Sequence, residues 1–189
     1  MKKIELGRLN IIKANDELLS NLDFDCGDED LNEFLLKDSF KNIKNKLCTI
    51  FLCVYQSQVV GFFSLSADSI KVTDKLVVNY PDYPAIKIGR LAVSKNFHNL
   101  HIRSLMISWI VGFCRNLGDE IGVRFISVDA YNNEKTIKFY ENNFFVESES
   151  VMKKKGRRNI PMYRDICEKF NIIVQEFSGF FKPGDELHF

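Results

Sequence analysis

The chain of 189 residues lacks a long hydrophobic run, and no stretch approaches the ~20 apolar residues that a membrane-spanning helix needs. Its first residues alternate apolar and charged side chains, so the hydrophobic region of a signal peptide is missing too. Neither charge dominates, because 26 basic side chains balance 25 acidic ones. This balance excludes a protein that coats nucleic acid over its whole surface. We therefore expect a soluble, cytoplasmic protein with no membrane partner.

The sequence also lacks closely spaced pairs of cysteines. The five cysteines are widely spread and form no C-x-x-C pair, which argues against a disulfide framework or a zinc knuckle. His98 and His101 are spaced for one face of a turn, but no third ligand lies nearby in the sequence, so we expect no metal site. Apolar residues make up 46% of the chain, which excludes a largely disordered protein.

The order of the predicted elements indicates one α/β domain with a mixed sheet. Two apolar runs, 48–55 and 59–65, predict an antiparallel hairpin, and the three-four spacing of apolar residues predicts a helix over 102–117. The other predicted elements are a strand at 8–12, a helix capped by Asp28, strands at 86–93 and 123–130, a helix at 133–142, and strands at 144–151 and 160–166.

The last segment differs in composition from the rest. Five phenylalanines fall within residues 167–189, whereas no Gly/Ser/Pro-rich linker divides the chain before them. We expect residues 1–166 to form the domain and residues 167–189 to form an extension. A run of exposed Phe would be an interaction surface, so the extension packs either on its own domain or on a second copy, as in a homodimer.

The segment from Ile88 to Ile102 is the first candidate site. A strand there leads through a polar loop into the strong helix, and the N-terminus of a helix presents unpaired N–H groups and a positive dipole end to an anion. Two alternatives remain open at this point: a phosphate site, or an ordinary turn between a strand and a helix.

Several motifs in order resemble the GNAT family of N-acetyltransferases, over about residues 24–165. Asn133-x-x-Thr136-x-x-x-Tyr140-x-x-x-Phe144-Phe145 is similar to that family's N-x-x-A-x-x-x-Y-x-x-x-G-F pattern. Further matches are Phe24-x-Cys26-Gly27, Gly89-Arg90-Leu91-Ala92-Val93, Val128-Asp129-Ala130 and Pro161-Met162-Tyr163-Arg164-Asp165. The resemblance implies an α/β (α+β) fold whose mixed, mostly antiparallel sheet is flanked by helices. It also implies transfer of an acetyl group from acetyl-CoA, the co-substrate, to a primary amine.

The resemblance also implies a set of cofactor-binding residues. The family's Q/R-x-x-G-x-G/A phosphate loop aligns with residues 98–103, where His101 and Arg103 replace both glycines. These side chains either crowd the phosphates or bind them as cations. The implied acetyl-CoA site consists of Leu91, Ala92, Val93, His98, Asn99, His101, Ile102, Arg103, Ser104 and Asn133. Since Phe144 replaces the glycine of the second motif, we expect Asn143 to take the left-handed conformation.

Tyr140 is the candidate catalytic residue. By the resemblance it matches the tyrosine that protonates the departing CoA thiolate, a proton that a phenol can donate at pH 7. The alternative is a half-buried tyrosine that only packs against the core. Asp129 is a candidate for the group that removes the proton of the amine, or it caps the following turn, and the general base stays unassigned.

The acceptor has two candidate classes, aminoacyl-tRNA or a small amine or peptide N-terminus. The resembled subgroup includes toxins that acetylate aminoacyl-tRNA, which implies tRNA and an antitoxin as partners. The basic run 153–158 is either an RNA contact or a solvated hairpin tip, and its charged residues are Lys153, Lys154, Lys155, Arg157 and Arg158. The glycine-poor loop also motivates a different class, an interaction module on this scaffold without catalysis.

Overall fold

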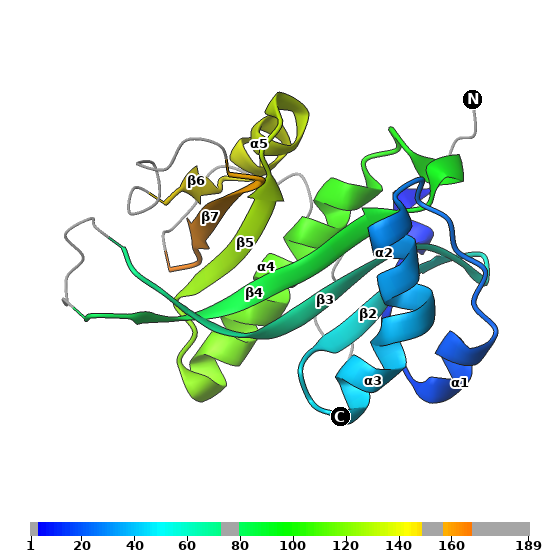
Figure 1. Ribbon diagram of the computed structural model, residues 1–189, viewed down its shortest axis with the longest axis horizontal. Helices are drawn as coiled ribbons and strands as arrows, with labels where there is room; N and C mark the ends of the chain where they lie inside the picture. The colour runs from blue at the N-terminus through cyan, green and yellow to red at the C-terminus, as the bar shows by residue number, and fades with distance from the viewer. Residues whose placement is uncertain (1–3, 73–79, 149–156, 168–189) are drawn as a thin grey trace.

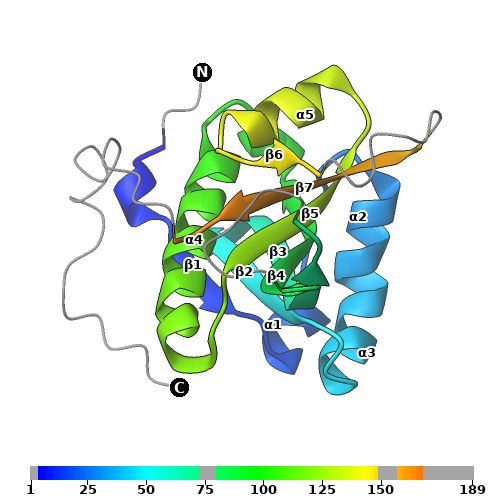
Figure 2. The same ribbon diagram turned by 90° about the vertical axis from the view of Figure 1, so that its left-hand side faces the viewer.

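Figure 1 shows the computed structural model, which describes residues 4–72, 80–148 and 157–167. These residues form a twisted sheet with helices on both faces, as the side view in Figure 2 shows. The predicted α/β class with a mixed sheet is confirmed. Lys153, Lys154, Lys155 and residues 168–189 of the predicted extension lie outside the described residues. Within the described ranges, no helix is both long enough and apolar enough to cross a bilayer.

The sheet has seven strands in the order β1-β2-β3-β4-β5-β7-β6. β4 and β5 run parallel, and the other neighbouring strands in the described sheet are antiparallel. The strands are β1 (Asn10–Lys13), β2 (Thr49–Tyr55), β3 (Gln58–Ile70), β4 (Tyr83–Val93), β5 (Phe125–Tyr131), β6 (Val146–Glu147) and β7 (Asn159–Asp165).

One face of the sheet is covered by α4 (Ile102–Ile121). Its buried side chains, among them Met106 and Ile110, pack into the main hydrophobic core with residues of β2 to β5. The helix predicted over 102–117 is confirmed and extends to Ile121. It ends there because Gly122 adopts a left-handed conformation (φ 72°), which terminates a helix at little cost for glycine.

The opposite face is covered by α1 (Asp16–Ser20), α2 (Glu29–Glu33) and α3 (Ser39–Lys44), and a π-helical turn (Phe34–Asp38) joins the last two. The Asp28 carboxylate accepts a hydrogen bond from the Leu31 N–H (3.2 Å), which confirms the predicted cap. The sequence did not predict α1, a helix of five residues with no buried side chain and hence no apolar periodicity to detect.

The predicted hairpin is confirmed as β2 and β3. Both residues of its turn, Gln56 and Ser57, have positive φ (48° and 63°), as a two-residue hairpin turn of the primed type requires. β3 continues to Ile70, so it is longer than the apolar run predicted, and it pairs with β4 from Gly61 to Ile70.

α5 (Glu134–Glu141) is followed by one correction to the sequence analysis. Phe144 itself adopts the left-handed conformation (φ 64°), and the prediction for Asn143 is wrong. The Asn143 side chain instead donates a hydrogen bond to the Phe139 carbonyl (2.8 Å), which holds it to the last turn of the helix. The strand predicted from residue 144 therefore begins later, at Val146.

Candidate active site

A cleft opens between β4 and β5 because these strands separate halfway along their length. They pair from Ala85 with Phe125 as far as Ile88 with Val128. Beyond this point β4 stays paired with β3, and β5 stays paired with β7. The main chain of Gly89–Val93 therefore has one edge directed into the cleft rather than towards a neighbouring strand. We call this cavity the β4–β5 cleft.

A β-bulge at Gly89 lies at the point of separation. In the register of β3 with β4, Leu65 pairs with Ile88 and Ser64 pairs with Arg90, so Gly89 is an extra residue. A bulge bends a strand and increases its twist, and here it directs the end of β4 away from β5. A Cβ atom at Gly89 would lie 3.0 Å from the Ser64 Oγ, so glycine allows this close approach.

The β4–β5 cleft has a volume of about 530 Å³. It brings together most of the predicted catalytic and cofactor residues, although these come from β4, the following loop, α4 and α5. The predicted residues that line it are Leu91, Ala92, Val93, His98, Arg103, Asn133 and Tyr140. Asn133 also caps α5, because its side-chain oxygen accepts a hydrogen bond from the Thr136 N–H (2.9 Å).

The remaining predicted cofactor residues are Asn99, His101, Ile102 and Ser104, in the loop and the first turn of α4. Ile102 is 1% exposed as a whole residue and packs in the core. The Ser104 carbonyl already accepts a hydrogen bond from the Ser108 hydroxyl (3.1 Å). Asn99 and His101 are exposed, and none of these four residues is among those that line the β4–β5 cleft.

The start of α4 is built to receive an anion. His101 precedes it in a left-handed conformation (φ 60°), so the backbone keeps the shape that a glycine would supply at this position. No side chain of the described residues caps the helix, and the N–H groups of Ile102, Arg103 and Ser104 have no carbonyl partner inside it. The Arg103 guanidinium, over the Phe139 ring at 5.2 Å, adds a positive charge beside them.

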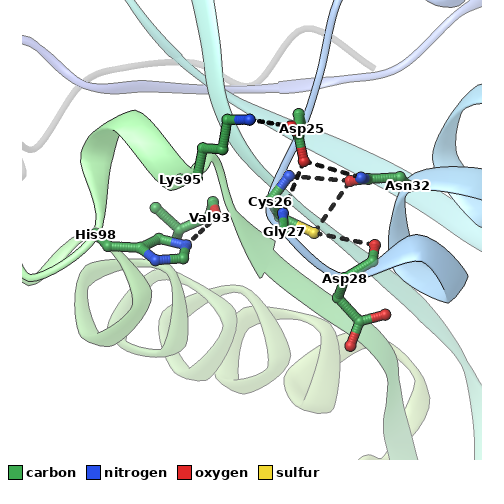
Figure 3. Close-up of polar contacts among 8 residues, drawn as sticks. All are labelled: Asp25, Cys26, Gly27, Asp28, Asn32, Val93, Lys95 and His98. Carbon is green, nitrogen blue, oxygen red and sulfur yellow. Dashed lines mark hydrogen bonds and ion pairs between the residues drawn. The ribbon is translucent and has the colours of Figure 1, made fainter.

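His98 fixes the loop between β4 and α4. Its Nε2 lies 2.9 Å from the carbonyl oxygen of Val93, the last residue of β4 (Figure 3). A carbonyl only accepts hydrogen bonds, so Nε2 carries the hydrogen in this contact. The ring thereby holds the loop against the end of the strand that lines the cleft.

Asp25 ties the loop before α2 to the end of β4 (Figure 3). Its carboxylate forms an ion pair with Lys95, just after the strand, and accepts a hydrogen bond from the Asn32 amide (3.0 Å). The Lys95 ammonium and two N–H donors lower the pKa of Asp25 to about 2. The oxygen of Asn32 in turn accepts from the N–H of Cys26 (2.9 Å), which lines the cleft.

Tyr140 reaches the cleft from α5 and is 7% exposed. Its ring packs edge-on against Phe139 and Phe145, at centroid distances of 5.1 and 5.3 Å. Burial raises the pKa of Tyr140 to about 12, although the nearby Arg103 opposes this rise. The phenol is therefore neutral at pH 7 and can donate a proton. Tyr140 both packs against the core and lines the cleft, so the catalytic role stays a prediction beside the packing role.

Asp129 also lines the cleft, but it is not free there. Its carboxylate lies 2.7 Å from the Lys87 ammonium. This pair separates the cleft from a second, smaller cavity of about 210 Å³, which both residues also line. On that side the Ser127 hydroxyl donates a hydrogen bond to the carboxylate of Asp68.

The described part of the basic run ends beside the cleft. The Arg158 guanidinium lies 5.9 Å from the ring centroid of Tyr131, a residue that lines the cleft. Arg157 precedes it, and its main-chain carbonyl accepts a hydrogen bond from the Asn132 amide (2.9 Å).

Several lining residues were not predicted to belong to the site, although Cys26 and Arg90 lie on motifs of the family resemblance and Asp28 is the predicted helix cap. They are Cys26, Asp28, Leu31, Lys87, Arg90, Tyr131, Lys135 and Asn159. The family motifs were a signal for Cys26 and Arg90, whereas the alternation of side chains along β4 and β5 indicates a face of the sheet rather than a cavity. Within the described ranges, no three His, Cys, Asp or Glu side chains are grouped to hold a metal ion.

Comparison with known proteins gives a sequence match over most of the chain. The model of the acetyltransferase (GNAT) family matches residues 15–144. A tRNA-acetylating toxin of Mycobacterium tuberculosis is 30% identical over 115 residues, which are 59% of this chain and 69% of that protein.

Solved structures share the fold. The structure of AtaTR bound with AcCoA has a TM-score of 0.69 at 21% identity and covers 85% of this chain and 95% of its own. AtaT complexed with acetyl-methionyl-tRNAfMet has a TM-score of 0.70 at 20% identity, with coverage of 92% and 99%. These similarities in fold agree with the match in sequence. The chain belongs to the acetyltransferase (GNAT) family and is an N-acetyltransferase.

Proposed function

We propose that the protein transfers an acetyl group from acetyl-CoA to the α-amino group of an aminoacyl-tRNA in the β4–β5 cleft. One observation carries the chemistry: a buried, neutral phenol, Tyr140, lines the same cavity as the unpaired main-chain edge of β4. The first can protonate a leaving group, and the second can hold and polarise a thioester.

The residues present fit acetyl-CoA. The free N–H groups at the start of α4, with the Arg103 side chain, match a pyrophosphate in charge and geometry. The edge of Leu91–Val93 offers strand-like hydrogen bonds to the amides of the pantetheine arm and an N–H to the thioester oxygen. The left-handed backbone at His101 keeps the shape of the loop, so the loss of its glycines does not favour a non-catalytic module. A related fold with bound AcCoA supports the same assignment.

In the proposed reaction, the neutral amine attacks the thioester carbonyl, and a bond forms between nitrogen and carbon. The bond between carbon and sulfur then breaks, and the departing sulfur takes the proton of the Tyr140 hydroxyl. The new amide nitrogen releases its surplus proton to water, and the tyrosine regains a proton from solvent.

Aminoacyl-tRNA is the acceptor favoured by the relatives. One relative with 30% identity is a tRNA-acetylating toxin, and a protein of the same fold was solved with acetyl-methionyl-tRNAfMet. The position of Arg158 beside the cleft agrees with an RNA acceptor. An antitoxin is then the expected protein partner. The expectation of a homodimer through residues 168–189 stays a prediction, which sizing with and without that segment tests.

The test is acetylation by the purified protein with labelled acetyl-CoA and bulk aminoacyl-tRNA. We expect label on the α-amino group, released with the amino acid when the ester is hydrolysed, and growth arrest when the protein is expressed in bacteria. Label on a small amine or on peptide N-termini, with none on tRNA, would instead identify the other acceptor class. Absence of acetyl-CoA binding at millimolar concentration in calorimetry would refute the proposed cofactor.

A further inference from the structure

A cluster of polar residues at the end of β5 has no role in the reaction described so far. We call it the Tyr131 cluster and define it as Asp28, Asp30, Arg90, Tyr131, Arg158 and Asn159. Asp28, Arg90, Tyr131 and Asn159 line the β4–β5 cleft. Tyr131 and Asn159 are direct neighbours in the register of β5 with β7. The cluster thus forms part of the cleft wall and is contributed by four segments distant in sequence, at α2, β4, β5 and β7.

Two guanidinium groups lie on aromatic rings in this cluster. Arg158 lies over Tyr131 at 5.9 Å, and Arg90 lies over Phe34 at 5.2 Å. Arg90 also approaches the Asp30 carboxylate, with its Nη2 3.7 Å from Oδ2. A planar guanidinium on a ring is a surface on which a further planar group can stack.

Charges of both signs surround the Tyr131 hydroxyl. Burial raises the pKa of Tyr131, the carboxylates of Asp28 and Asp30 raise it further, and the guanidiniums of Arg158 and Arg90 oppose this rise. The hydroxyl is therefore within electrostatic reach of two anions and two cations. Such a mixed surface suits a ligand that offers both donors and acceptors.

Two polar atoms of the cluster are buried without a hydrogen-bond partner in the described part of the chain. They are the Nε of Arg90, a donor, and the Oδ1 of Asn159, an acceptor. A buried polar atom without a partner costs free energy, and a native structure rarely keeps one that no ligand or water ever satisfies. Both residues line the cleft, so these two buried atoms lie beside it, and a small shift of either side chain would present its atom to a bound molecule.

We propose that the Tyr131 cluster binds the 3′-terminal nucleotide of the acceptor RNA, an inference that rests on the proposed function. The base stacks on the Arg158–Tyr131 pair, as bases do on aromatic and guanidinium planes in single-stranded RNA sites. The Arg90 N–H and the Asn159 oxygen bind hydroxyl groups of the ribose. This arrangement brings the aminoacyl ester of that ribose into the cleft that Tyr140 lines.

Three acceptors separate this proposal from its alternatives: bulk aminoacyl-tRNA, puromycin as an aminoacyl-nucleoside without phosphates, and an amino acid amide without a nucleoside. For Tyr131→Ala and Arg158→Ala we expect kcat/KM to fall about tenfold or more on tRNA and on puromycin. On the amide we expect a change of less than about twofold, because the amide has no base to stack.

Conservative variants identify stacking as the cause. Tyr131→Phe keeps the ring, so it should retain most of the activity that Tyr131→Ala loses. Arg158→Lys keeps the charge but loses the plane, so it should resemble Arg158→Ala. A full recovery of activity in Arg158→Lys would mean that charge alone matters and would overturn the proposal.

The outcomes distinguish failure of the proposed function from failure of the Tyr131 cluster as a nucleotide site. If the wild-type protein acetylates no aminoacyl-tRNA, the proposed function fails. If it does, and the alanine variants lose activity equally on all three acceptors or on none, the Tyr131 cluster is not a nucleotide site. Acetyl-CoA affinity and thermal unfolding of each variant show whether its fold is intact, and Arg158, which is exposed, keeps the test valid if Tyr131→Ala does not fold.

Discussion

The Lys87 ammonium lies 2.7 Å from the Asp129 carboxylate, next to the last pair of residues that joins β4 to β5. Lys87 precedes Ile88, and Asp129 follows Val128, so the ion pair spans the two strands where they separate. It also forms the wall between the β4–β5 cleft and the smaller cavity beside it. The carboxylate nearest the splitting point is thus balanced by a cation of the neighbouring strand.

We expect this ion pair to contribute little to folding. Its side chains are 35% and 43% exposed, and partly exposed pairs contribute about 0 to 1 kcal/mol. A double-mutant cycle of Lys87→Met and Asp129→Asn, followed by urea unfolding, should give a coupling below about 1 kcal/mol. A coupling above about 2 kcal/mol would contradict this view. With stability nearly unchanged, any loss of turnover in these variants reports on the cleft.

Replacing Tyr140 by Phe should lower kcat about 100-fold or more, because the leaving thiolate loses its proton donor. The pKa of about 12 means that the phenol stays protonated over the usual range of assays. The wild-type rate should therefore show no alkaline fall due to Tyr140 below about pH 11. Tyr80→Phe, at a tyrosine that is 62% exposed and outside the cleft, is the matched control. Equal rates for both variants would remove Tyr140 from the reaction.

Phe144 is a side chain in a conformation that favours glycine (φ 64°). Phe144→Gly and Phe144→Ala both remove the ring, which lies under the Arg164 guanidinium at 5.3 Å. Only the glycine variant also relieves the left-handed strain, which costs about 1 kcal/mol for an L-residue. The glycine variant should therefore be more stable than the alanine variant by about that amount in thermal unfolding. Equal stabilities would show that the turn has relaxed.

Asp25 should make stability depend on pH at the acid end. Its pKa in the folded protein is about 2, below the ordinary 3.8, so the stabilisation it provides is complete above about pH 4 and is lost between about pH 4 and pH 2. Asp25→Asn should melt at a lower temperature than the wild type at pH 7, and this difference should disappear as the pH falls to 2. Lys95→Gln should reproduce the effect, and the double variant should add little.

The helices and strands with strong periodicity could be predicted from the sequence. α4 and the β2–β3 hairpin follow from the spacing of apolar residues, because each buries one continuous face. α1 could not be predicted, since it buries no side chain. The left-handed residue after α5 was predicted wrongly as Asn143, because tertiary packing overrides local conformational preference. It holds Phe144 in a conformation that phenylalanine by itself disfavours.

The candidate site was predicted where it follows a local motif and missed where it depends on topology. His98, Arg103 and Tyr140 lie on contiguous motifs of the family resemblance, which predicted them as site residues, and all three line the cleft. Arg90, Tyr131 and Asn159 come together only because β4 and β5 are adjacent in the sheet and β7 pairs with β5. No spacing in the sequence encodes that adjacency.

The bulge at Gly89 also changes the phase in which β4 alternates. Before it, Ile86 and Ile88 face the core; after it, Leu91 and Val93 do, so the even-numbered positions give way to the odd-numbered ones. Deleting this one residue would exchange the inner and outer side chains of the second half of the strand. One extra residue in the two-residue alternation therefore marks, along the linear sequence, where β4 separates from β5.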